Sequence, residues 1–213
     1  MNVKRRLQVN TVQTGKNDNM FNVLLDILPE SYEGYGIDTD FETGIQITQA
    51  LEDKELTEQE RMYVAFGLLY KDIPENFDTA YNGLKWFLSS WNNDNHTSGN
   101  SEVTVMDFDV DQWRIYAAFR SQYNINLNSE KMHFWEFMAL LANLGECSFT
   151  KVIEIRGKKI TAKMSAQEKK DINKAKRIYA IKSKKSEEYS EAEQERINTF
   201  LKYSNQSKNT DGK

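Results

Sequence analysis

The stretch from Asp107 to Leu144 constrains the fold of this 213-residue chain most, because two of its segments repeat apolar residues at helical spacing. The second segment follows a plausible helix N-cap, Ser129, and precedes a glycine suited to a helix end, Gly145. This placement predicts a second helix of about four turns. A short polar connector at residues 124–128 joins the segments, so the sequence predicts an αα-hairpin.

Aromatic side chains dominate the predicted interior of this hairpin. The first helix is expected to bury a face that contains Val110, Trp113 and Ala117, which recur every three to four residues. Residue chemistry alone therefore indicates a scaffold and no catalyst. The predicted core scaffold consists of Trp113, Tyr116, Trp135, Phe137 and Leu141.

Three capping boxes predict further helix starts, because the first side chain and the fourth satisfy each other's backbone N–H groups. They lie at residues 57–60, 165–168 and 190–193. Apolar spacing adds a short helix before Pro29 and helices near residues 41–51, 77–91 and 149–155. The predicted fold class is mainly α: a helical bundle of αα-hairpins, with a minor β-hairpin near residues 32–40 and a lysine-rich C-terminal helix.

Composition along the chain predicts four parts. Residues 1–19 and 204–213 are polar and aperiodic, which is typical of disordered ends. Residues 20–160 are expected to form a helical core domain. Residues 161–203 are expected to form a basic and then mixed-charge helical extension.

Charge is strongly segregated along the chain. Residues 1–150 carry 11 basic and 23 acidic side chains, a net charge of −12, whereas residues 151–186 carry 13 basic and 3 acidic ones, a net charge of +10. Such asymmetry concerns partners and self-association more than the fold. The candidate partner-binding residues are Lys169, Lys170, Lys174 and Arg177.

These basic residues admit three interpretations. We favour a solvated helix whose lysines face an acidic surface, in the same chain or in a neighbouring subunit. A protein partner comes second. Nucleic acid comes last, because residues 151–186 contain one aromatic residue, Tyr179, and the neighbouring acidic domain would repel phosphates.

No motif in the sequence indicates catalysis, a cofactor or a metal ion. The run DFDVD at Asp107–Asp111 fails as a calcium loop, because Gln112 and Ala118 stand where that loop needs glycine and glutamate. It fits acidic residues at a helix start better, with one of them as N-cap. The single cysteine, Cys147, and two histidines cannot make a zinc site. With no apolar run long enough for a membrane span and no signal peptide, we expect a non-enzymatic protein that stays inside the cell.

Several segments together resemble the small tail-gene family of Gram-positive siphophages and prophages that is usually listed as the bacteriophage "gp fifteen" family. The resemblance covers about residues 20–182, and its specificity comes from the order and spacing of the helical segments. The segments are MFNVLLDILPE at Met20–Glu30, IDTDFETGI at Ile37–Ile45, LTEQERMYVAFGLLYKDIPENFDTAYNGLKWFL at Leu56–Leu88, DFDVDQWRIYAAFRSQYNINL at Asp107–Leu127, MHFWEFMALLANL at Met132–Leu144 and FTKVIEIRGKKI at Phe149–Ile160.

This resemblance implies a function in phage morphogenesis. Family members are neighbours of the tape-measure gene and are regarded as tail assembly chaperones, so the expected partners are the tape-measure protein, other tail proteins and further copies of this chain. The expected place of action is the host cytoplasm during assembly. A structural tail component that stays in the virion is the alternative, and a nucleic-acid-binding module that uses residues 151–186 is a weaker one.

Overall fold

The computed structural model describes residues 21–91 and 104–181. The chain divides into two compact units, Met1–Tyr179 and Ala180–Lys213, and nearly all of the second unit lies outside the described residues. The ends predicted to be disordered, at residues 1–19 and 204–213, and the helix predicted from the capping box at residues 190–193 also lie outside them. The predicted domain boundary after residue 160 stays a prediction.

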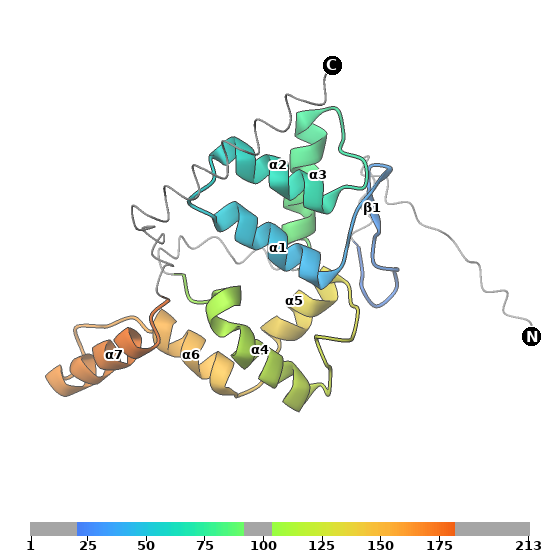
Figure 1. The fold of residues 1–213 in the computed structure, drawn as a ribbon. Coiled ribbons are helices and arrows are strands. Elements are labelled where there is room, and N and C mark those ends of the chain that lie inside the picture. The colour runs from blue at the N-terminus through green and yellow to red at the C-terminus, as the bar shows by residue number, and fades with distance from the viewer. Residues whose placement is uncertain (1–20, 92–103, 182–213) are drawn as a thin grey trace, which may run out of the picture. The chain divides into compact units, whose positions relative to one another are not determined.

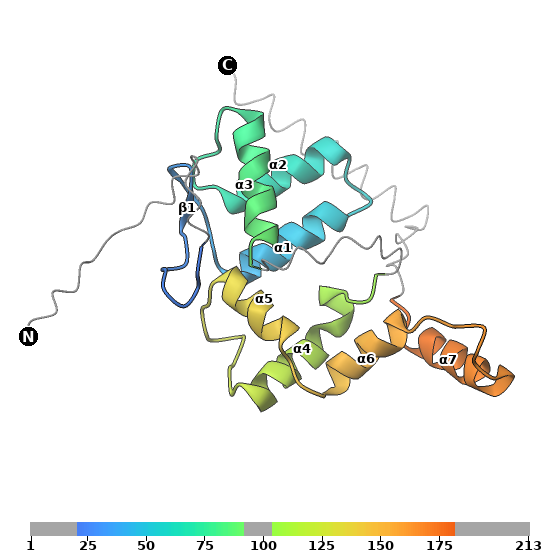
Figure 2. The same cartoon turned by 180° about the vertical axis from the view of Figure 1, so that it is seen from behind.

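The described residues of the first unit are mainly helical, which confirms the predicted fold class (Figure 1). Figure 2 shows α1, α2 and α3 as one group and α4, α5 and α6 as a second group. The elements in chain order are β1 (Ser31–Tyr32), β2 (Tyr35–Gly36), α1 (Phe41–Glu52), α2 (Glu58–Leu69), α3 (Phe77–Ser89), α4 (Phe108–Gln122), α5 (Phe134–Ala142), α6 (Ser148–Gly157) and α7 (Ala166–Ile178).

Local sequence signals set three of the helix starts. Thr57 and Ser165 each form a complete capping box, at the starts of α2 and α7. Asp107 caps α4 by accepting a hydrogen bond from the backbone N–H of Val110 at 2.7 Å. These contacts confirm the capping boxes predicted at residues 57–60 and 165–168 and the prediction of an aspartate N-cap.

Tertiary pairing shortens α5, so the prediction that this helix follows Ser129 is wrong. Phe41 N–H donates to the carbonyl of Met132 at 3.0 Å, and Phe134 N–H donates to the carbonyl of Thr39 at 2.7 Å. The chain before Phe134 is therefore held extended against the start of α1. His133 caps α5 instead, because its Nδ1 accepts the backbone N–H of Trp135 at 3.0 Å.

The segment before Pro29 also differs from expectation. Residues 23–26 form turns and no helix. Val23, Leu24, Leu25 and Ile27 are all largely exposed, so no buried surface supports a helix there. The predicted β-hairpin does form, with Ser31 paired to Gly36 and Tyr32 to Tyr35.

The centre of the fold is a group of stacked rings that we call the aromatic core. Phe137 stacks on Phe41 and on Phe119 with centroids 5.0 Å and 5.1 Å apart, and Phe87 stacks on Phe134 at 5.1 Å. These rings come from α1, α3, α4 and α5, so the core extends beyond the predicted hairpin. The aromatic core consists of Phe41, Phe87, Phe119, Phe134 and Phe137.

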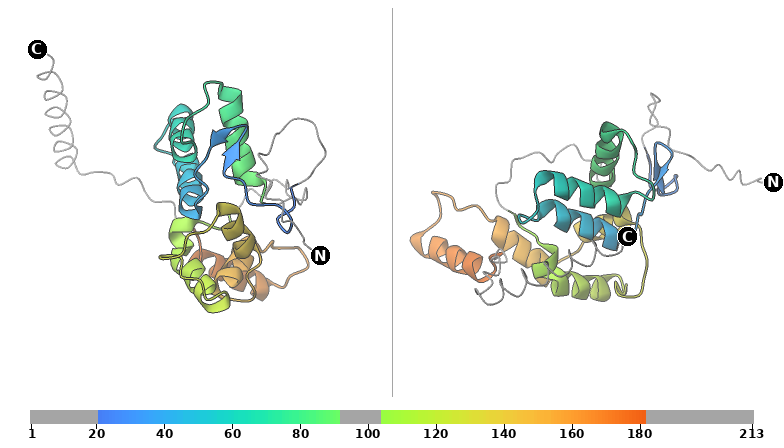
Figure 3. Two further views of the ribbon diagram at one scale, coloured as in Figure 1. Left: turned by 90° about the vertical axis from the view of Figure 1, so that its right-hand side faces the viewer. Right: turned by 45° about the horizontal axis from the view of Figure 1, so that its top comes forward.

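Close approach of helices accompanies this stacking. Figure 3 shows α1 beside α2, and α1 also packs on α5. Gly44 of α1 lies against Phe134, where an added Cβ would overlap the phenyl ring. The indole N–H of Trp135, also buried, donates to the carbonyl of Phe87 at 2.7 Å.

One predicted core residue is on the surface. Trp113 is 74% exposed, and Val110 and Ala117, which share its predicted face, are exposed as well. α4 buries the neighbouring stripe instead, which consists of Asp111, Ile115, Ala118 and Phe119. Both stripes recur at helical spacing, so periodicity alone could not separate them. Tyr116 lies between the two and is half-buried, whereas Trp135, Phe137 and Leu141 are buried.

Candidate interaction surface

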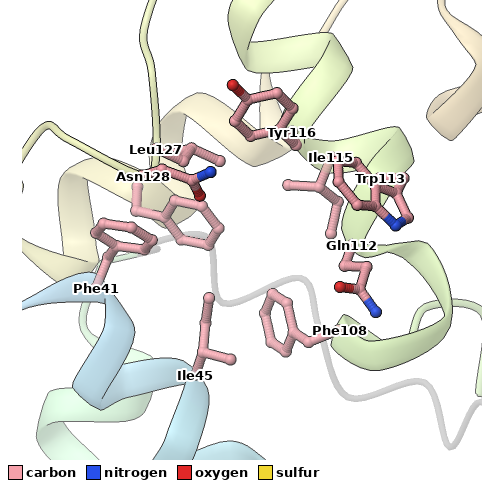
Figure 4. A pocket seen from close by; sticks show the side chains of 10 residues that line it. Phe41, Ile45, Phe108, Gln112, Trp113, Ile115, Tyr116, Leu127 and Asn128 are labelled. Carbon is pink, nitrogen blue, oxygen red and sulfur yellow. The ribbon is translucent and has the colours of Figure 1, made fainter.

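An apolar groove opens at the surface between α1, α4 and the chain that precedes α5 (Figure 4). Its volume is about 260 Å³. Two of its side chains are amides and the rest are apolar or aromatic, so its chemistry suits packing more than catalysis. The groove is lined by Phe41, Ile45, Phe108, Gln112, Trp113, Ile115, Tyr116, Leu127, Asn128 and Phe137.

Helical spacing brings these side chains together. On α1, Phe41 and Ile45 are four residues apart and therefore share a face. In Figure 4 they lie across the groove from Phe108 and Trp113 of α4. Phe41 and the buried Ile115 belong to the hydrophobic core, so the inner wall of the groove is the outer surface of that core.

Trp113 forms the exposed lip of the groove. Its ring packs edge-to-face on Tyr116, with the centroids 6.1 Å apart. The Tyr116 hydroxyl lies 3.2 Å from Oδ1 of Asn126, which holds the tyrosine beside the groove. A large aromatic side chain that is exposed beside a preformed hollow is typical of a binding anchor.

The two ends of the groove differ in charge. At the Phe41 end, Lys131 Nζ lies 2.9 Å from Asp40 and 3.7 Å from Glu42, which neutralises much of the acidic charge. At the Phe108 end stand Glu52 and Asp107, which we call the acidic end, and neither forms an ion pair within the described part of the chain.

A hydrogen bond between α1 and α4 holds the two carboxylates of the acidic end near each other. Gln49 of α1 donates to Asp109 of α4 at 2.7 Å, and Glu52 lies three residues further along the same face. Partial burial raises the pKa of Glu52, and the negative charge of Asp107 raises it further. This repulsion means that a cation placed here would be stabilised by both groups.

The candidate residues on α7 divide into two sets. Lys170, Lys174 and Arg177 are exposed and follow an i, i+4, i+7 pattern, so they line one outward face that we call the cationic ridge. None of the three forms an ion pair within residues 21–91 and 104–181. Lys169 is half-buried on another face, with Nζ 3.5 Å from the carbonyl of Ala162.

A buried ion pair, which we call the charged pin, fixes α6 to α4. Arg156 forms two hydrogen bonds to Asp111, at 2.5 Å and 3.1 Å, and both side chains are almost fully buried. Arg156 also donates to the carbonyl of Val105 at 3.0 Å and to that of Tyr179 at 2.6 Å. The Arg114 guanidinium lies 5.9 Å from the Tyr179 ring, so the end of α7 is held as well.

The sequence offered no signal for the charged pin. Asp111 and Arg156 are 45 residues apart, and each stands among other charged or polar residues. Only the folded contact shows which aspartate of the acidic run is buried. The sequence predicts a helix start for the run, which is true of Asp107 but incomplete for Asp111.

A second exposed apolar surface lies at α2 and α3. Phe77 stacks on Tyr81 at 6.1 Å and packs edge-to-face on Phe66 at 5.7 Å. Phe77 and Tyr81 are largely exposed, and so is Tyr63 on α2.

The described residues offer no group of three or more His, Cys, Asp or Glu side chains that could hold a metal ion. No helix in the same residues is both long enough and apolar enough to cross a membrane. Burial lowers the pKa of His133, which serves as the cap of α5, and its Nε2 lies 3.1 Å from the carbonyl of Pro29.

Comparison with known protein families gives a match over most of the chain. The family model described as "Bacteriophage Gp15 protein" matches residues 23–181. No curated protein and no solved structure matches the chain.

Proposed function

The chain belongs to the Bacteriophage Gp15 protein family, and from this membership we propose that it is a non-enzymatic chaperone of phage tail assembly that binds the tape-measure protein. The match confirms the Gp15 family, which the helical segments resemble. The proposed place of action is the host cytoplasm during assembly.

The observation that carries this proposal is the apolar groove with Trp113 at its lip. An amphipathic helix can place side chains at i, i+3 or i+4 into such a groove. A long helical protein that is apolar along one face presents such side chains repeatedly. Covering them before the tail tube forms would keep that protein from aggregating.

The charges of the groove support a helical partner over a small metabolite. Its walls are apolar, and its polar lining is limited to Gln112 and Asn128. Acidic and neutralised ends set a direction along the groove, which would favour one orientation of a bound helix.

Co-expression with the tape-measure protein, followed by pull-down and light scattering, tests the proposal. We expect the tape-measure protein to aggregate alone and to form a soluble complex of defined stoichiometry with this chain. Trp113→Ser should weaken the complex, because it removes the anchor at the lip.

A matched control distinguishes binding in the groove from non-specific hydrophobic binding. Tyr63 is also an aromatic residue with 74% exposure, but it lies on α2 outside the groove. Tyr63→Ser should therefore leave the complex intact. Absence of a complex with the unaltered chain would contradict the proposal, and recovery of the chain in purified particles would then favour a structural tail component.

A further inference from the structure

We propose that the cationic ridge of α7 in one copy docks at the acidic end of the apolar groove in a second copy, with Ile178 entering the groove. Free protein would then associate head to tail and cover its own apolar surface. This self-association does not depend on the proposed chaperone function. A further step, in which the tape-measure protein displaces the second copy from the groove, rests on that function.

The cationic ridge has the chemistry that this contact needs. Lys170, Lys174 and Arg177 project from one exposed face without an ion pair in the described residues. Ile178 is 65% exposed and stands four residues after Lys174, so it lies beside the ridge. α7 thus presents an apolar side chain next to three cations.

The groove offers the complementary arrangement. Its apolar lining ends at Phe108, and Glu52 and Asp107 stand at that end. Glu52 and Asp107 repel each other, so a lysine or arginine placed beside them would be stabilised by both charges. Docking would therefore pair the cations of the ridge with the acidic end and bury Ile178 in the groove in the same contact.

A second copy is the occupant that fits, because α7 cannot easily reach its own groove. The face of α7 opposite the ridge is half-buried, and the end of α7 is held by the bond from Arg156 to the carbonyl of Tyr179. Moving α7 would break that bond and the contact between Arg114 and the Tyr179 ring. The ridge points outward while these contacts persist.

The contact would be heterologous, because the ridge and the groove are different surfaces. Such contacts repeat along an open chain unless their rotation closes a ring. A symmetric pairing of two grooves would instead leave the cationic ridges of both copies without a carboxylate partner, so it would gain less electrostatic free energy. The opposite charges of residues 1–150 and 151–186 favour the head-to-tail arrangement for the same reason.

The test is the molar mass of the full-length chain, measured by light scattering over a range of protein and salt concentrations. A ridge variant carries Lys170→Gln, Lys174→Gln and Arg177→Gln, and a groove variant carries Glu52→Lys and Gln112→Arg. The unaltered chain should associate with rising concentration, and salt should weaken it. Each variant should associate about tenfold more weakly or worse, since several exposed charge contacts are lost together.

Mixing the two variants gives the decisive result. The groove variant keeps an intact ridge, and the ridge variant keeps an intact groove, so a single contact between them remains. The mixture should therefore form a one-to-one complex and stop there. A control chain with Lys158→Gln, Lys159→Gln and Lys163→Gln loses the same charge from exposed positions outside the ridge and should associate like the unaltered chain.

Several results would overturn the proposal. These are a chain that stays monomeric at every concentration, association that the ridge variant leaves unchanged, a mixture without a one-to-one complex, or a ridge that binds duplex DNA in place of a second copy. Circular dichroism of each variant shows that it is folded. If self-association follows this pattern but a tape-measure segment does not reduce it, the self-association stands and the groove fails as the chaperone site.

Discussion

The aromatic core and the charged pin hold neighbouring parts of the same molecule by opposite means. In the aromatic core, stacked rings from four helices share the contact, and each ring has several apolar neighbours. In the charged pin, one arginine side chain joins α4, α6 and the end of α7. Stabilisation in the core is thus distributed, whereas at the pin it depends on a single group.

This contrast teaches how each region should respond to change. Loss of one ring from the aromatic core leaves a cavity that its neighbours can partly fill. Loss of Asp111 leaves the buried Arg156 guanidinium without its carboxylate. Loss of Arg156 leaves Asp111 with Arg114, whose guanidinium lies 3.0 Å away. α7 has no buried residue of its own, so its position depends on the pin more than on packing.

The largest effect is expected at the pin. Asp111→Ala should lower the free energy of unfolding by about 3–5 kcal/mol, because it leaves Arg156 buried without its carboxylate. Denaturant unfolding measures the change. Asp111→Leu combined with Arg156→Met is the control, since a matched apolar pair should restore stability to within about 1–2 kcal/mol. A single variant as stable as the unaltered chain would show that the pin is dispensable.

Trp135→Ala tests the aromatic core and should lower the free energy of unfolding by about 3–5 kcal/mol, because it removes a buried indole. Its bond to the carbonyl of Phe87 is lost as well. Trp113→Ala is the matched control and should change stability by less than about 0.5 kcal/mol, since this residue is exposed. Thermal and denaturant melts check both, and equal effects would contradict the assignment of the two residues.

Gly44→Ala sharpens the comparison at the closest approach of α1 and α5. Alanine favours a helix over glycine, but its Cβ would overlap the Phe134 ring. The overlap should dominate and lower the free energy of unfolding by about 1–3 kcal/mol. Gly67→Ala is the control, because nothing lies within contact of a Cβ there, and it should be neutral or stabilising. A stabilised Gly44→Ala chain would show that α1 and α5 can separate.

The smallest effect concerns pH and the cap of α5. His133 Nδ1 accepts the Trp135 N–H, so protonation of Nδ1 would set a donor against a donor. Burial lowers the folded-state pKa of His133 below its ordinary 6.5. Its contribution to stability is therefore complete above pH 6.5 and is lost as the pH falls through that value toward the folded-state pKa.

The loss should be about 1 kcal/mol, the usual contribution of a helix cap. Unfolding measured between pH 7.5 and pH 5 should show this loss in the unaltered chain. His133→Asn keeps a capping side chain without a titrating group, so it should remove this part of the pH dependence. An unchanged pH profile in that variant would exclude His133 as the source.

Signals that depend on neighbouring residues in the chain were predictable from the sequence. The capping boxes at Thr57 and Ser165 and the cap at Asp107 each involve atoms within three residues, so their pattern is visible in the sequence. The helical class followed from the same local regularity. The start of α5 was not predictable, because it depends on backbone bonds between residues 132–134 and residues 39–41.

The candidate surface was only partly predictable for the same reason. The lysines of α7 are visible as charge, but only the folded helix separates Lys169 from the cationic ridge. Trp113 fits the periodicity of a core residue, and its exposure depends on which stripe of α4 meets α1 and α5. The charged pin joins residues too distant in sequence to be paired from their spacing.

The exposed position of Trp113 also gives the protein a built-in optical probe. The other three tryptophans, Trp86, Trp91 and Trp135, are at least partly buried. Indole emission shifts to shorter wavelength when water leaves the ring, so occupation of the groove should change the signal of Trp113 most. A chain in which Trp86 and Trp91 are replaced by phenylalanine would then report, without any label, when the groove fills and when it empties.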